Sequence, residues 1–256
     1  MRLATTLTAA VIVLVSAAGL ATAKDWTNIR IGTEGAYAPF NFKDADGKLQ
    51  GFDVDIALAI CEKIKAQCTV VAQDWDGIIP ALQAGKYDAI FASMAGTDER
   101  KQIIDFSDKY YNVPSAFFAA KDSGITDTSP AGLAGKTLGA QSSTIQANEL
   151  EEKYKDAEIK LYPSQEEVNL DLAAGRIDAL FVDKTVGMEW VAKTDDGKCC
   201  QQVGADVPSP AGVAAGIRKE DQDLKELINK GIKEILADGT YEKINAKYFP
   251  FSIYGD

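Results

Sequence analysis

One segment of this chain is repeated, with substitutions, 90 residues further along. Residues 82–93 are L-Q-A-G-K-Y-D-A-I-F-A-S, and residues 172–183 are L-A-A-G-R-I-D-A-L-F-V-D. In each copy a helical pattern ends at a glycine, Gly85 or Gly175, where a left-handed cap is favoured, and an apolar strand pattern follows. The common pattern of helix–strand units accounts for part of such a match. Two similar lobes explain it better.

Strand and helix patterns alternate along the first half of the chain. We expect strands at 29–32, 68–72 and 87–92, separated by helices at 53–65 and 77–84. This alternation is typical of α/β layers with a largely parallel sheet.

The ends of the two repeated strands mark a candidate binding cleft. Ser93 and Asp183 occupy equivalent places at a strand's carboxyl end, where open α/β sheets bind ligands. Arg100 follows Ser93 at a loop-to-helix junction, and its planar fork of donors matches a carboxylate. Alternatively, Thr97 only caps that helix while Arg100 pairs with a nearby acid, and Asp183 only caps the helix that begins at Lys184.

A polar turn at Gln141-Ser142-Ser143-Thr144 follows an expected strand at 137–140 and opens an expected helix at 145–154. Hydroxyls and free N–H groups at such a helix start suit a carboxylate, although capping alone also explains them. The segment lacks the glycines and lysine of a phosphate-binding loop.

Two aromatic residues and one acid lie close to the ends of the first strands. Tyr37 is on a loop after the first strand, and Trp75 follows the strand at 68–72. Two such rings could clamp a flat or aliphatic side chain, and a guanidinium would gain about 0.5–2 kcal/mol from stacking. Glu34 could hold a distal positive charge. The alternatives are that both rings are core residues and that Glu34 is solvated surface.

Residues 1–23 have the features of a cleaved secretory signal: one positive charge, a short apolar stretch and a final A-T-A. We expect the mature chain to begin near Lys24, with a retained membrane anchor as the alternative. No second apolar run approaches the roughly 20 residues that span a bilayer. The sequence therefore predicts an exported protein.

Charge and composition exclude several classes of function. Asp and Glu number 38 against 27 Lys and Arg, giving a net charge of −11, which argues against nucleic acid or an anionic membrane surface as partner. The chain has no histidine. This excludes Ser-His and Cys-His nucleophile pairs and histidine-liganded zinc.

Four cysteines in an exported chain favour disulfides, with three possible pairings. Cys61 and Cys68 bracket the end of an expected helix and the next strand, so closure of that short loop is the preferred pair. Whether the adjacent Cys199 and Cys200 bond to each other stays open. A metal site built from all four is a weaker alternative, because neither pair has C-x-x-C spacing.

Several motifs in the same order resemble the polar amino acid binding proteins of bacterial ABC importers, in the group for lysine, arginine, ornithine, histidine and arginine-derived opines. They are A-Y-A-P-F at 36–40, G-F-D-V-D-I-A at 51–57, T-D-E-R-K-Q-I-I-D-F-S-D-K-Y at 97–110, A-G-R-I-D-A at 174–179 and A-D-G-T-Y-E-K-I at 237–244.

The resemblance implies an α/β, two-lobed periplasmic binding protein fold (type II). Each lobe would be a mostly parallel sheet flanked by helices, with two hinge strands between the lobes. Lobe I would comprise residues 24–112 and 215–256, and lobe II residues 113–214. The chain would cross between lobes near 112–114 and 211–216. The protein would be a periplasmic monomer, not an enzyme, and would deliver its ligand to an ABC transporter permease without any cofactor or metal.

The resemblance also assigns roles within the cleft. Arg100 would hold the ligand α-carboxylate with help from Ser93 and the backbone near Thr144, and Asp183 would hold the α-amino group. The side chain would lie between Tyr37 and Trp75, and its distal charge would meet Glu34. Gln141, Ala92, Ala95 and Ser143 complete the expected site, and Cys61–Cys68 matches the family's disulfide.

One departure from the family concerns the head of the ligand. Ala95 stands where relatives carry a serine, and Gly96 where a branched residue is common. We expect this change to remove a hydrogen-bond donor and to open space beside Arg100, which would suit an opine with its additional carboxylate. Two other roles remain possible for this fold: a cyclic acid dehydratase with Glu34 as general acid, and a sensor that presents its ligand to a receptor.

Overall fold

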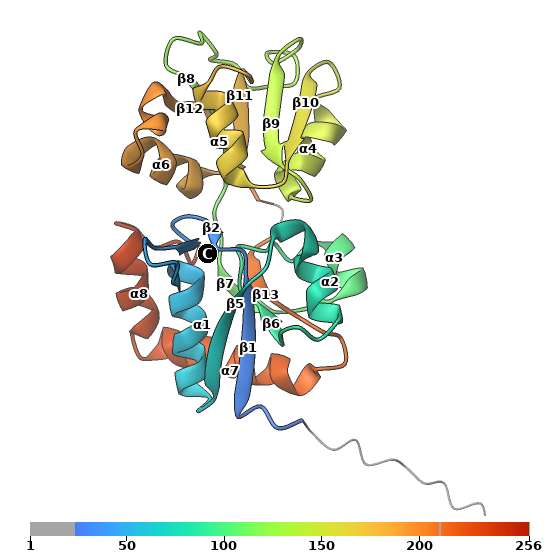
Figure 1. Ribbon diagram of the computed structural model, residues 1–256, viewed down its shortest axis with the longest axis vertical. Helices are drawn as coiled ribbons and strands as arrows, with labels where there is room; N and C mark the ends of the chain where they lie inside the picture. The colour runs from blue at the N-terminus through green and yellow to red at the C-terminus, as the bar shows by residue number, and fades with distance from the viewer. Residues whose placement is uncertain (1–23, 210, 256) are drawn as a thin grey trace, which may run out of the picture.

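The computed structural model describes residues 24–209 and 211–255. It consists of two α/β lobes stacked along the long axis of the molecule (Figure 1). The predicted export signal at residues 1–23 lies outside the described residues. Within the described residues, no helix has both the length and the apolar character needed to cross a membrane.

The first lobe is built on a five-stranded sheet in the order β5-β1-β6-β13-β7. Strand β1 pairs in parallel with both β5 and β6, whereas β13 is antiparallel to β6 and β7. The strands of this sheet are β1 (Asn28–Thr33), β5 (Gln67–Ala72), β6 (Ala89–Ile90), β7 (Asp105–Tyr111) and β13 (Val213–Ile217). A small antiparallel sheet follows β1, formed by β2 (Ala36–Tyr37), β3 (Asn41–Lys43) and β4 (Leu49–Gln50).

Helices cover this first sheet on both sides (Figure 1). They are α1 (Phe52–Lys63), the short 3-10 turn η1 (Trp75–Gly77), α2 (Ile78–Gln83), α3 (Asp98–Ile103), α7 (Gln222–Ala237) and α8 (Thr240–Tyr248). Helices α1 and α7 cross closely, because a Cβ at Gly231 would lie 2.6 Å from a side-chain carbon of Ile60. The glycine therefore allows the two buried helix faces to meet.

The second lobe repeats the architecture, with strand order β10-β9-β11-β8-β12. Strand β9 pairs in parallel with β10 and β11, as β1 does with β5 and β6. The strands are β8 (Ser115–Ala120), β9 (Thr137–Gln141), β10 (Glu158–Tyr162), β11 (Ala179–Asp183) and β12 (Cys200–Val207). Helices α4 (Ile145–Lys153), α5 (Gln165–Ala173) and α6 (Lys184–Lys193) and the 3-10 turn η2 (Asp196–Cys199) flank the sheet.

The sequence repeat corresponds to the unit α2-β6 in the first lobe and α5-β11 in the second. Gly85 and Gly175 have φ angles of 71° and 68°, so both provide the left-handed residue expected between helix and strand. The strand expected at 87–92 is much shorter, however. Strand β6 comprises only Ala89 and Ile90, because its antiparallel partner β13 contacts it only at these two positions.

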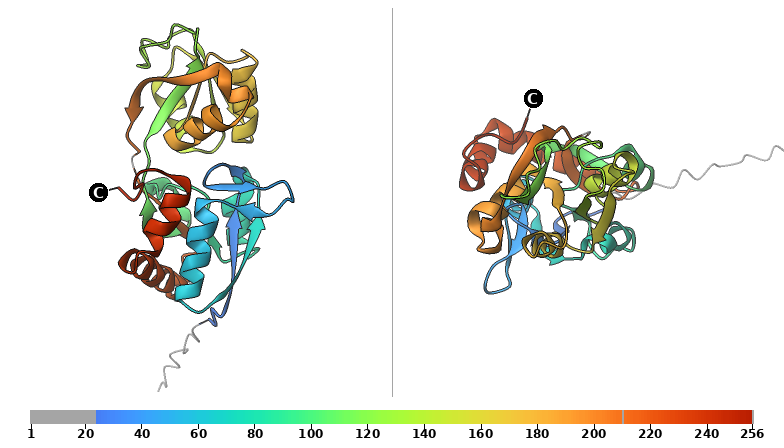
Figure 2. Two further views of the ribbon diagram at one scale, coloured as in Figure 1. Left: turned by 90° about the vertical axis from the view of Figure 1, so that its left-hand side faces the viewer. Right: turned by 90° about the horizontal axis from the view of Figure 1, so that it is seen from above.

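Two connections join the lobes, and both pass on the same side of the molecule (Figure 2). Residues 112–114 lead from β7 to β8, and residues 208–212 lead from β12 to β13. Val213 and Ala214 pair with β7 in the first sheet, although the sequence analysis assigned them to the second lobe. The second crossing therefore lies slightly earlier than expected, since β13 begins at Val213.

Both cysteine pairs form disulfides. Cys61 at the end of α1 is bonded to Cys68 in β5, as preferred from the sequence. Cys199 is bonded to its neighbour Cys200, which answers the question that the sequence left open. The described residues contain no free cysteine and no cluster of acids and cysteines suited to a metal ion.

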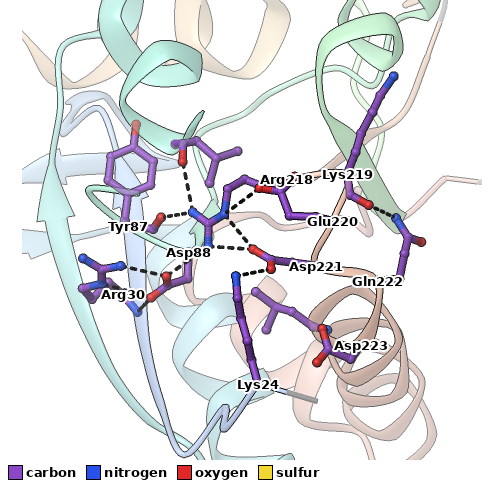
Figure 3. Close-up of polar contacts among 12 residues, drawn as sticks. Lys24, Arg30, Tyr87, Asp88, Arg218, Lys219, Glu220, Asp221, Gln222 and Asp223 are labelled. Carbon is purple, nitrogen blue, oxygen red and sulfur yellow. Dashed lines mark hydrogen bonds and ion pairs between the residues drawn. The ribbon is translucent and has the colours of Figure 1, made fainter. Parts of the chain in front are cut away.

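A cluster of ion pairs holds the far end of β13 (Figure 3). Arg218 lies 2.7 Å from the carboxylate of Asp221 and 3.2 Å from that of Asp88, and it donates to two backbone carbonyls that precede β6. Asp88 also accepts from Arg30, and Lys24 pairs with Asp221. Because Arg218, Asp88 and Asp221 are buried, each charge depends on its partners.

Candidate functional site

A cavity lies where the two lobes meet. Its volume is about 440 Å³, part of which opens to solvent. Every residue that the sequence analysis placed in the site lines this cavity, except Ser143. Five further lining residues were not foreseen. The full lining comprises Glu34, Tyr37, Trp75, Ala92, Ser93, Ala95, Arg100, Val113, Gln141, Thr144, Ile145, Gln146, Asp183, Ser209 and Val213.

Asp183 contributes a buried carboxylate from the end of β11. It accepts hydrogen bonds from the Tyr37 hydroxyl at 3.0 Å and from Nε2 of Gln146 at 2.8 Å. Asp183 is the N-cap residue of α6, as the alternative held, but its side chain makes no capping hydrogen bond and lines the cavity, so capping is not its only role. Burial raises the pKa of this carboxyl to about 7, and its hydrogen bonds offset only part of that rise.

Glu34 contributes a second buried carboxylate directly after β1. It accepts a hydrogen bond of 2.6 Å from Nε2 of Gln141 in the other lobe. Its side chain is buried, with 8% exposure, so the interpretation of Glu34 as solvated surface is wrong. Burial raises the pKa of Glu34 to about 7, and the nearby Asp74 and Asp76 add to the rise.

Arg100 supplies the positive charge of the cavity. Its Nη1 donates to the carbonyl of Ala95 at 3.0 Å, and its Nη2 donates across the lobes to the carbonyl of Ser143 at 2.9 Å. Burial lowers the pKa of Arg100 to about 10, which leaves the group charged at neutral pH. Thr97 does cap α3, as the alternative held, but within the described residues Arg100 forms no ion pair with an acid.

The two aromatic residues are buried and also face the cavity. Tyr37 and Trp75 are each 8% exposed and pack in the cores of the first lobe, so each ring is both a core and a cavity residue. The guanidinium carbon of Arg100 lies 5.2 Å from the centre of the Trp75 ring. In this arrangement Trp75 stacks on a cation of the protein itself, which supports the view that the ring can hold a flat cation.

Within the polar turn before α4, Gln141 and Thr144 line the cavity, whereas Ser142 and Ser143 connect the lobes. The hydroxyls of Ser142 and Ser143 donate to the carboxylate of Asp76 at 2.9 and 2.8 Å. Ser143 has a φ of 59°, and its carbonyl accepts from both Trp75 and Arg100. Thr144 caps α4, as one alternative held. We call the contact of Asp76 with Ser142 and Ser143 the cross-lobe latch.

Gly96 does not open space in the cleft, so that expectation is wrong. A Cβ placed on Gly96 would point toward the ring of Phe106, 3.4 Å away in the core of the first lobe. Ala95 does line the cavity, so its methyl group is the part of the departure that a ligand can meet.

Residues 29–251 match the family described as bacterial extracellular solute-binding proteins, family 3. The chain belongs to this family. The histidine-binding periplasmic protein of Escherichia coli (strain K12) is 43% identical over 234 residues, which cover 89% of this chain and 90% of that protein. The octopine-binding periplasmic protein of Rhizobium meliloti is 36% identical over 99% of each chain. A solved structure of an ancestral arginine-binding protein bound to arginine is 36% identical, with a TM-score of 0.82 over 87% of this chain and 98% of that one.

Membership of this solute-binding family confirms the predicted two-lobed fold and the predicted role in solute binding. The roles of individual cavity residues stay predictions. Sequence reasoning missed Gln146, which contacts Asp183 from the first turn of α4, and Asp76, whose acceptor role depends on the opposite lobe. Asp76 adjoins Trp75 in the D-W-D segment, so its position near the cleft was visible in the sequence. Its contact across the lobes was not.

The charges in the cavity of this solute-binding protein are unbalanced. Two buried carboxylates, Glu34 and Asp183, line the cavity together with one half-buried guanidinium, Arg100. Burial raises the pKa of both carboxyl groups, and the hydrogen bonds that they accept offset only part of this rise, since no cation is in direct contact with them. A ligand with two positive charges and one negative charge would supply the missing partners.

Proposed function

We propose that this protein captures a cationic amino acid in the cavity between its lobes and delivers it to an ABC transporter permease. The observation that carries the proposal is the charge pattern of the cavity, in which Arg100 is accompanied by two buried carboxylates. Arg100 binds the α-carboxylate, Asp183 the α-ammonium and Glu34 the distal cation. Arginine fits this pattern best, because a planar guanidinium also stacks on Trp75 or Tyr37.

Capture involves a rotation of the two lobes about residues 112–114 and 208–212. The lobes already touch through hydrogen bonds from Tyr37 to Asp183 and from Gln141 to Glu34, together with the cross-lobe latch. A bound ligand would replace the hydrogen bonds between polar groups inside the cavity with its own, while the cross-lobe latch would remain. Closure therefore favours a ligand that satisfies both lobes at once.

An arginine-derived opine is a second candidate ligand, and Ala95 favours it. The methyl group of Ala95 lines the cavity where the family pattern has a hydroxyl, so the ligand head loses one hydrogen bond there. A substituent on the α-nitrogen can use that space. The octopine-binding relative is consistent with such a ligand in this family.

Calorimetric titration of residues 24–256 tests the ligand class. The ligands are arginine, lysine, histidine, octopine and citrulline, which has the shape of arginine without its distal charge. We expect arginine or octopine to bind at least about ten-fold more tightly than citrulline, since loss of a charged hydrogen bond costs about 1.5–3 kcal/mol. Equal affinity for arginine and citrulline, or no binding of any ligand, contradicts the proposal.

Two variants assign the charges. Glu34→Gln should abolish the preference for arginine over citrulline, whereas the matched variant Glu151→Gln, at an exposed carboxylate, should preserve it. Arg100→Met should remove binding without lowering the unfolding temperature. Binding retained by Arg100→Met would show that another group holds the ligand carboxylate.

Export and delivery follow from the same proposal. We expect the signal to be removed before Lys24, and N-terminal sequencing of protein from the periplasm checks this. The mature protein should be a monomer by light scattering. It should stimulate ATP hydrolysis by its permease, reconstituted in vesicles, only when the ligand is present.

A further inference from the structure

Asp53 is fully buried next to the cavity residue Ser93, and its carboxylate accepts every hydrogen bond that it makes. It lies in the first turn of α1, and its Oδ2 lies 2.9 Å from Nδ2 of Asn41, 2.8 Å from the backbone nitrogen of Ser93 and 3.1 Å from the Ser93 hydroxyl. Its Oδ1 accepts from the Tyr110 hydroxyl at 2.8 Å. No cation lies among these partners.

The direction of two of these bonds is fixed by the surrounding backbone. Oδ1 of Asn41 accepts the N–H of Gly35 at 2.8 Å, so the amide of Asn41 must turn its NH₂ group toward Asp53. The backbone N–H of Ser93 can only donate. Oδ2 of Asp53 is therefore an acceptor, and a proton on this carboxyl group would have to be on Oδ1, facing Tyr110.

This arrangement also fixes the direction of the Ser93 hydroxyl. Its oxygen lies between Oδ2 of Asp53 and the hydroxyl of Tyr111, which is 2.7 Å away. A serine hydroxyl has one proton and two lone pairs. The proton must go to Asp53, since Oδ2 has none to give, and the buried Tyr111 must then donate to Ser93. One lone pair of the Ser93 hydroxyl remains.

Ser93 presents that lone pair at the cavity. It is partly exposed, lines the cavity and has a left-handed φ of 53°, a conformation that its two bonds to Asp53 stabilise. Asp183 and Asp53 are close enough to influence each other electrostatically. A positive N–H donor is therefore favoured between Ser93 and Asp183, and a carboxylate is disfavoured there.

We propose that Asp53 is a positioning residue that makes the Ser93 hydroxyl an acceptor for the ligand's α-ammonium, next to Asp183. The inference rests on the proposed function and changes one part of it. The family resemblance assigned Ser93 to the α-carboxylate, whereas the hydrogen-bond directions assign it to the α-ammonium and leave the carboxylate to Arg100 and the backbone.

Three ligands separate these assignments. Arginine carries all three charges, 5-guanidinopentanoate lacks the α-ammonium, and agmatine lacks the carboxylate. The variant Ser93→Gly removes the hydroxyl and keeps the left-handed backbone without strain. Lys65→Gly is the matched control, because Lys65 has a φ of 60° and lies at the end of α1, away from the cavity.

We expect Ser93→Gly to weaken arginine binding by roughly ten-fold to one hundred-fold, the range for one hydrogen bond to a charged group. Its affinity for 5-guanidinopentanoate should stay within about three-fold of the wild type. Agmatine, which keeps the ammonium, should lose affinity by a factor similar to that of arginine. A matching loss with 5-guanidinopentanoate, or no loss with arginine, overturns the inference. Failure of the wild-type protein to bind any of the three would instead refute the proposed function.

Substitutions of Asp53 test its positioning role. Asp53→Asn keeps an oxygen for Ser93 and Asn41 and turns its NH₂ group to Tyr110, whose hydroxyl can accept, so arginine should keep its advantage over 5-guanidinopentanoate. Asp53→Ala frees the Ser93 hydroxyl, and this advantage should fall as it does in Ser93→Gly. A purely structural role would weaken both ligands equally. If Asp53→Ala fails to fold, as thermal unfolding would show, the Ser93→Gly comparison still decides.

Discussion

Arginine binding should depend on pH between pH 8 and pH 6, because the cavity contains two carboxyl groups with a raised pKa. Burial raises the pKa of both Glu34 and Asp183 to about 7 in the unliganded protein. A bound cation would return each pKa toward its ordinary value near 4. The affinity is therefore nearly fully present at pH 8 and falls as the carboxyl groups take up protons at lower pH.

The size of the effect follows from the two pKa values. Lowering the pH from 8 to 6 raises the free-energy cost of deprotonating one group with a pKa of about 7 by about 1.4 kcal/mol, which is ten-fold in affinity. Two groups give about one hundred-fold. Binding at pH 6 should release about 1.8 protons, against about 0.2 at pH 8. Arginine itself does not change charge in this range, and the chain contains no histidine.

Isothermal titration in buffers of different ionisation enthalpy measures both the affinity and the proton release. Glu34→Gln should halve the slope of log affinity against pH and reduce the release at pH 6 by about one proton. Burial also raises the pKa of Asp53, to about 6. Because Glu34→Gln leaves Asp53 in place, the pH dependence that this variant loses is due to Glu34 and not to Asp53. A pH-independent affinity without proton release would refute the assignment of both carboxylates to ligand cations.

Three further predictions concern closure and stability. Asp76→Ala removes the cross-lobe latch and should speed dissociation of every ligand by a similar factor, about two- to five-fold for an exposed contact, in stopped-flow experiments. Arg218→Met should lower the free energy of unfolding in urea by about 3–5 kcal/mol, because it leaves buried carboxylates unpaired, and arginine affinity should not change. Replacing Cys61 and Cys68 by alanine should cost about 2–3 kcal/mol of unfolding free energy, whereas replacing the adjacent pair at the junction of η2 and β12 should cost much less, since it closes a far shorter loop.

The fold and most of the residues that line the cavity could be predicted from the sequence, because both depend on features that are local or repeated. The glycine between helix and strand in each repeat determines where β6 and β11 begin, and thus where Ser93 and Asp183 emerge. Arg100 was identified by its place at a helix start. Such positions are set by backbone geometry, which residue patterns predict.

The directions of side chains were less predictable, because they depend on contacts between distant segments. Gly96 looked like added space in the cleft, yet its open side faces Phe106, and only the packing of β7 shows this. Ser143 looked like a ligand residue, but its hydroxyl turns to Asp76 in the other lobe. The role of Asp53 depends on donors from three separate parts of the first lobe, Asn41, Ser93 and Tyr110.

The ion-pair cluster at the end of β13 determines where a fluorescent label can serve as a fixed reference for measuring closure. Strand β13 begins at the second crossing and is followed directly by Arg218, which two carboxylates and two carbonyls hold near the start of α7. Because β13 is fastened in this way, we expect the rotation to be taken up at the two crossings between the lobes and not to reach α7. A fluorophore at Lys233 should therefore be a stationary reference, and its distance to a second dye on α4 or α5 would measure closure as transfer efficiency.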